Sequence, residues 1–223
     1  MGSTMNAMDR VGALSGAAYV ILANVGNTLG QDASLSESAT GEEVLESYAR
    51  LADDVGRQLG LSIEMLGLAT WMIFVGYVYS RTRGAGWLAP AALVAGTISI
   101  AVKFASFAPV ISIYLLRGDM EPGTASMLAN LNLVSFMIDT LPAGLFVACG
   151  AAAAMASGAL GRVLGWAGVV CGVIAAGAAV VIGIRIEGSF APSFLLVMVW
   201  VFAVSIRWGF ARSRAKAAVT GAD

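Results

Sequence analysis

The chain has 223 residues, of which 58% are hydrophobic and only 12% are charged, and its net charge is −1. Because an average soluble domain carries about 25% charged residues, this composition excludes an ordinary soluble domain and indicates an integral membrane protein. The near-zero net charge argues against nucleic acid as a partner, and the absence of histidine removes the commonest ligand of zinc and haem sites. The sequence therefore predicts no metal site and assigns no cofactor.

Continuous apolar runs of helical length predict an all-α, polytopic transmembrane bundle, because about 20 apolar residues cross a bilayer. The chain is expected to form a single transmembrane domain with six spans, at residues 11–29, 58–79, 87–116, 125–156, 160–184 and 191–210. The third and fourth spans are long for one crossing, and each contains a proline, Pro109 or Pro142, at which a helix can bend. The lipid bilayer is thus the first predicted partner.

An acidic segment, residues 31–57, separates the first two spans. Thr40 and Glu43 have the spacing of a capping box that opens a helix. Apolar side chains then recur at helical spacing, at Val44, Tyr48, Leu51, Val55 and Leu59. This pattern predicts an amphipathic helix, and it leaves open whether the helix lies at the membrane interface or extends the second span outward.

The distribution of basic residues predicts a multi-pass cell-membrane protein with both termini in the cytoplasm. That orientation leaves four basic residues outside, Arg50, Arg57, Arg117 and Arg185. It assigns eight to the cytoplasmic side: Arg10, Arg81, Arg83, Arg162, Arg207, Arg212, Arg214 and Lys216. Since cytoplasmic loops carry the excess of Lys and Arg, the acidic segment is expected to be extracytosolic.

Three ionisable residues lie inside the predicted spans, at Glu64, Lys103 and Asp139. Each is costly in the bilayer, so each is expected to face a partner or a water-filled cavity. Lys103 and Asp139 are equally far from Glu121 in the turn between their spans (121 − 103 = 18 and 139 − 121 = 18). Equal distances imply equal depth, which predicts a Lys103–Asp139 ion pair provided that the two helices face each other.

Polar residues lie between this pair and the predicted outer surface, at Glu64, Ser106, Asn130 and Asn132. Together they predict a polar pocket in the outer half of the bundle with Lys103 and Asp139 as its floor. Aromatic walls are expected from Trp71, Phe104, Phe107 and Phe136. Such a pocket would suit a small lipophilic or amphiphilic ligand. In the alternative, the two charges are a structural ion pair that fixes the helix register.

The first half of the chain resembles a family of small bacterial integral membrane proteins that is defined only as a domain of unknown function. The resemblance is carried by Asp53-Asp54-Val55-Gly56-Arg57, by Tyr79-Ser80-Arg81-Thr82-Arg83 at the end of the second span, and by Leu88-Ala89. It covers roughly residues 1–110. It implies a bundle of six or seven helices and no particular activity.

Two functions remain open from the sequence, and enzyme activity ranks behind both. The first is binding or transport of the lipophilic or amphiphilic ligand. The second is an accessory or scaffold subunit, in which the small residues of the first and fifth spans pack against a partner subunit or a second copy of the chain. No serine-hydrolase elbow, zinc-protease pair or phosphate loop is present, which leaves only a carboxylate mechanism at Glu64 or Asp139 for an enzyme.

Overall fold

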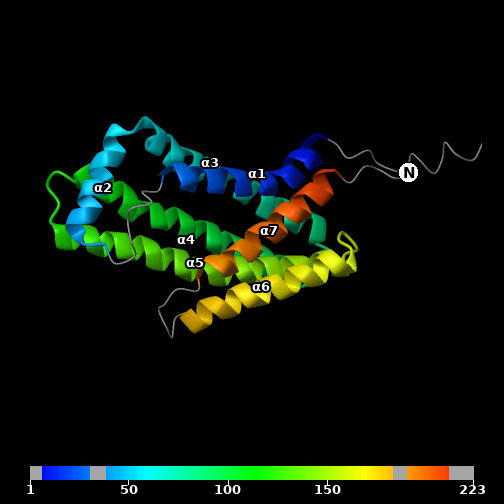
Figure 1. Cartoon of the computed structure of the whole chain (residues 1–223). Helices are drawn as coiled ribbons and strands as arrows, with labels where there is room; N and C mark the ends of the chain where they lie inside the picture. Colours follow the sequence, from blue (N-terminus) through cyan, green and yellow to red (C-terminus); the bar gives the residue numbers. More distant parts are fainter. Residues whose placement is uncertain (1–6, 31–38, 183–189, 211–223) are drawn as a thin grey trace, which may run out of the picture.

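The computed structural model describes residues 7–30, 39–182 and 190–210. Across these residues the protein is entirely helical, with seven helices and no strand (Figure 1). The helices are α1 (Ala7–Gly30), α2 (Gly41–Asp53), α3 (Val55–Thr82), α4 (Leu88–Leu116), α5 (Pro122–Ala156), α6 (Arg162–Ile182) and α7 (Phe190–Gly209). The all-α prediction is confirmed for the described part of the chain.

Four of the helices are long and apolar enough to cross a membrane: α3, α4, α5 and α6. The predicted first and sixth spans also form helices, α1 and α7, but these two are not among the four. Asn24 and Asn27 lower the hydropathy of α1, and the described apolar part of α7, Ser193–Gly209, is shorter than the other spans. The membrane character is therefore supported, and the count of six crossings stays a prediction.

The two ends of the bundle differ in what covers them (Figure 1). The beginning of α1 and the end of α7 lie at one end, here called the terminal end, where the Tyr77 ring meets the Trp208 ring at 5.8 Å between centroids. At the opposite end, here called the α2 end, α2 runs across the bundle from the α4–α5 turn to the beginning of α3. The α3–α4 and α5–α6 turns lie at the terminal end.

Glycine permits the closest helix contacts in the bundle. A side-chain carbon added at Gly26 of α1 would lie 2.6 Å from the backbone nitrogen of Glu64 and 2.7 Å from the carbonyl oxygen of Gly60 on α3. At Gly144 of α5, such a carbon would lie 2.6 Å from the backbone nitrogen of Ala176 on α6. These approaches leave no room for a side chain, as is typical of membrane helix pairs. The small-residue spacing thus serves packing inside the chain.

Aromatic rings fill the terminal half of the bundle. Trp71 stacks on Tyr19 with 4.6 Å between ring centroids and meets Phe146 edge-on at 4.9 Å. Phe74 lies in the same cluster, between Trp71 and Trp208. These rings come from α1, α3, α5 and α7 and are fully or almost fully buried. Offset and edge-on ring pairs add to the stabilisation from buried area, so this half is a packed core.

Helix α2 is a separate element, which excludes a simple outward extension of α3. The predicted capping box is present: the Thr40 amide donates to the Glu43 carboxylate at 2.7 Å, and the Glu43 amide donates to Thr40 Oγ1 at 3.3 Å. The buried side of α2 packs Val44 against Ile113 of α4 and Ala125 of α5. Helix α2 therefore covers the ends of α4 and α5.

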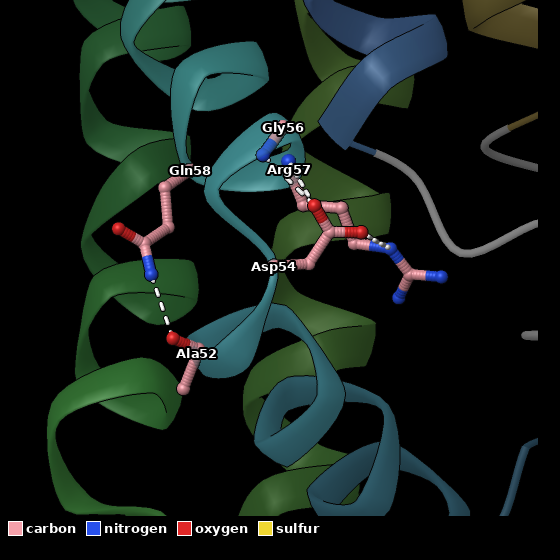
Figure 2. A network of polar contacts seen from close by, with 5 residues as sticks. All are labelled: Ala52, Asp54, Gly56, Arg57 and Gln58. Carbon is pink, nitrogen blue, oxygen red and sulfur yellow. Dashed lines mark hydrogen bonds and ion pairs between the residues drawn. The ribbon is translucent and has the colours of Figure 1, made fainter.

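The junction between α2 and α3 is fixed by Asp54 (Figure 2). Its carboxylate accepts hydrogen bonds from the amides of Gly56 at 2.8 Å and Arg57 at 3.3 Å, and it lies 3.5 Å from Arg57 Nε. The Gln58 side chain donates to the Ala52 carbonyl at 2.7 Å. Because the chain turns here, the predicted apolar stripe ends at Leu51, and Val55 and Leu59 are 69% and 54% exposed.

Candidate functional site

The predicted ion pair is present in the middle of the bundle. Lys103 Nζ of α4 lies 3.9 Å from Asp139 Oδ2 of α5, and the two side chains are 5% and 1% exposed. Within the described residues, neither oxygen of Asp139 accepts a hydrogen bond. The Ser99 hydroxyl, one turn before Lys103, lies next to the carboxylate without reaching hydrogen-bonding geometry. Lys103 is therefore the main compensation for the buried negative charge.

Two aromatic rings enclose the ammonium group of Lys103. Its Nζ lies 3.0 Å from the centre of the Phe136 ring and 5.0 Å from that of Phe194. A cation over the face of an aromatic ring is attracted by the ring quadrupole, most strongly when both are away from water. The ammonium is thus held between a carboxylate and two ring faces.

A cavity of about 480 Å³ lies between this pair and the α2 end. Helices α1 to α5 all contribute to its lining, whereas no described side chain of α6 or α7 does. Four of the six predicted site residues line it: Glu64, Ser106, Asn130 and Asn132. They meet because Glu64 lies on the inward side of α3, Ser106 follows Lys103 by one turn on α4, and the two asparagines precede Phe136 on α5.

The floor of the cavity differs from the prediction. Neither Lys103 nor Asp139 lines the cavity, whereas Phe136 does, and Phe136 is the ring that lies over the Lys103 ammonium. The expected charged floor is therefore an aromatic one, with the ion pair behind it. This arrangement follows from helix geometry, since Phe136 precedes Asp139 by about one turn on the same side of α5.

The predicted aromatic walls are only partly correct. Phe107 and Phe136 line the cavity. Trp71 instead lies in the packed core of the terminal half, and Phe104 is 40% exposed on the outside of the bundle. Neighbouring positions of one helix point to different sides, and a uniformly apolar sequence does not tell which side faces inward.

One polar wall of the cavity ties α4 to α5. The Asn132 side chain donates a hydrogen bond of 2.7 Å to the Ser106 carbonyl, and the Ser106 hydroxyl donates one of 2.7 Å to the Lys103 carbonyl. Both donors are therefore engaged with backbone oxygens. These bonds satisfy polar groups that would otherwise be costly between membrane helices.

Glu64 is the carboxylate of the cavity wall. Its side chain is partly buried, and it forms no hydrogen bond or ion pair with any other residue that the structure describes. Its backbone lies against Gly26 of α1, so the close α1–α3 contact holds this part of the α3 backbone in place. Among the described groups, Lys103 is the basic one that acts electrostatically on it.

Sequence reasoning missed the contribution of α2 and of the α2–α3 junction to the site. Ser47, Tyr48 and Leu51 of α2 line the cavity, as does Arg57 at the beginning of α3. Burial raises the pKa of Tyr48 from about 10 to about 12, so its hydroxyl stays neutral at physiological pH. The amphipathic spacing of α2 could have indicated this contribution, because the apolar face of such a helix packs against the rest of the protein.

No described group of three or more His, Cys, Asp or Glu side chains is placed to hold a metal ion. The chain matches no protein-family model, no curated protein and no solved structure. The described part of the chain thus defines only a class: a helical protein with four helices long and apolar enough to cross a membrane, and a cavity between helices. The resemblance to the bacterial membrane family of unknown function stays a prediction.

Proposed function

We propose that the protein is a multi-pass cell-membrane protein with six spans and both termini in the cytoplasm. We further propose that its cavity binds a small lipophilic or amphiphilic ligand. The observation that carries the proposal is the cavity of about 480 Å³ with mixed walls. Ligand pockets typically measure about 300–1,000 Å³ and combine apolar walls with a few polar groups.

The chemistry of the lining supports an amphiphilic ligand. Glu64 and Asn130 offer polar contacts, whereas Phe107, Val110 and Leu133 offer apolar surface. An amphiphile could place its polar group near Glu64 and its apolar part against the α4 and α5 walls. A purely polar solute would leave the apolar surface uncompensated, which favours a ligand with both characters.

The proposed orientation places the α2 end and its cavity outside. It rests on the excess of basic residues at the terminal end and in the two turns there. The beginning of α1 and the end of α7 lie together at that end, as an even number of crossings requires. Helix α2, with Glu42, Glu43 and Glu46, would then form an acidic outer cover.

The scaffold alternative receives less support from the packing. Gly12 and Gly16 of α1 lie against side chains of α3, and Gly168 and Gly172 of α6 lie against α7 and α5. The small-residue faces that were expected to meet a partner are thus largely covered by the same chain. A structural role for the Lys103–Asp139 pair is compatible with ligand binding, because the pair lies outside the cavity lining.

Co-purification tests the proposal. Lipophilic compounds retained by the detergent-purified protein would be extracted and measured by mass spectrometry, for wild type, Val110→Phe and Val94→Phe. Val110 lines the cavity, whereas Val94 of the same helix is exposed on the outside, so the second variant is a matched control. We expect a compound enriched in wild type and Val94→Phe and lost in Val110→Phe. Equal retention by both variants, or no enriched compound in wild type, would contradict the proposal.

A further inference from the structure

Resting on the proposed function, we infer that the cavity selects a lipophilic organic cation, with the Glu64 carboxylate as its counter-charge. The described interior of the bundle holds two carboxylates, Glu64 and Asp139, and one ammonium group, Lys103. Lys103 forms its ion pair with Asp139. Among the described residues, this leaves the Glu64 carboxylate at the cavity wall without a direct ion pair.

The position of Lys103 explains why it does not neutralise both carboxylates. Its ammonium lies 3.9 Å from Asp139 and is separated from the cavity by the Phe136 ring. Glu64, in contrast, lies in the lining of the cavity and forms no ion pair with Lys103. An unpaired carboxylate within a membrane bundle is costly, and a cation bound in the cavity would remove that cost.

Arg57 is the basic residue of the cavity lining, but it is engaged elsewhere. Its Nε lies 3.5 Å from Asp54 Oδ2 at the α2–α3 junction (Figure 2). Arg57 precedes Glu64 by two helical turns, which corresponds to about 10 Å along α3. Its charge is thus compensated by Asp54, about two turns away from Glu64 along the chain.

The remaining walls favour an organic cation over a metal ion. Phe107 and Tyr48 contribute aromatic surface to the lining, and aromatic faces attract organic cations. A metal ion gives up its water only for several oxygen ligands, and no cluster of three acidic side chains exists among the described residues. Apolar side chains such as Val110 and Leu133 would instead contact the hydrocarbon part of the ligand.

Two probes of the same shape and opposite charge test this inference. Radiolabelled tetraphenylphosphonium and tetraphenylborate would be measured by equilibrium dialysis against the detergent-purified full chain. We expect tetraphenylphosphonium to bind about tenfold more tightly than tetraphenylborate, because only the cation pairs with Glu64. Glu64→Gln should abolish this preference, while Glu64→Asp should retain most of it.

Control variants separate the charge effect from folding and from cavity binding as such. Glu42→Gln removes an exposed carboxylate on α2 and should leave both affinities unchanged. If tetraphenylborate binds as tightly as tetraphenylphosphonium and Val110→Phe blocks it, cavity binding stands and cation selection is overturned. Unchanged tetraphenylphosphonium affinity in a folded Glu64→Gln protein, or no binding of either probe, would also overturn the inference.

Discussion

The two halves of this bundle are built from the same helices but are filled differently. In the terminal half, Trp71, Phe74 and Phe146 interlock and leave little exposed surface between α3, α4 and α5. Toward the α2 end, the corresponding inward positions of α5 carry Ala129, Asn132 and Leu133. These side chains do not fill the space between the helices, and the cavity remains there. Side-chain volume thus decides where the bundle is solid and where it can hold a ligand.

The Lys103–Asp139 pair marks the border between the halves, and breaking it should have the largest effect. Asp139→Leu leaves a buried ammonium without its counter-charge, which should cost about 3–5 kcal/mol in the free energy of unfolding. The measurement is thermal unfolding of the detergent-purified protein. Because a pair of apolar residues of similar size needs no compensation, Lys103→Met combined with Asp139→Leu should recover most of the loss. If the single and the double variant were equally destabilised, the loss of stability would not come from an uncompensated Lys103 charge, and the prediction would be wrong.

A valine-to-phenylalanine exchange compares the packing of the two halves directly. Val75 lies in the packed core against Gly96, whereas Val110 lines the cavity. Overfilling a packed core costs about 1–3 kcal/mol, so Val75→Phe should lower the unfolding temperature. Val110→Phe should change it little, because the added ring enters existing space. A larger loss for Val110→Phe than for Val75→Phe would reverse the assignment of the solid and hollow halves.

The sequence predicted those features that depend on position along a helix. Lys103 and Asp139 were matched by their equal distance from the α4–α5 turn, and the capping box at Thr40 follows from its spacing to Glu43. Both rest on local geometry, namely a constant rise per residue and the unsatisfied amides at a helix start. The position of the pair and the beginning of α2 could therefore be read without a structure.

The sequence could not predict which side of each helix faces inward. Trp71 and Phe104 were both expected in the cavity wall, yet one is core and the other faces outward, because every side of these helices is apolar. The end of α2 was missed because the polar pattern around Asp54 is compatible with a helix that continues. In the structure, the Asp54 carboxylate instead accepts hydrogen bonds from the first amides of α3 and caps that helix. The aromatic floor was missed because it depends on how α4 and α5 face each other around Phe136.

The central claim is that the α2 half holds a cavity that opens to the outside, and two serines of α4 test it most directly. Ser99 and Ser106 are both 2% exposed and lie two turns apart on one side of the helix, but only Ser106 lines the cavity. Each would be changed to cysteine in a background carrying Cys149→Ala and Cys171→Ala, and intact cells would be treated with a membrane-impermeant trimethylammonium methanethiosulfonate. We predict modification of Ser106→Cys and none of Ser99→Cys. Equal reactivity at both positions, or reaction of Ser106→Cys only after the cells are permeabilised, would contradict the account.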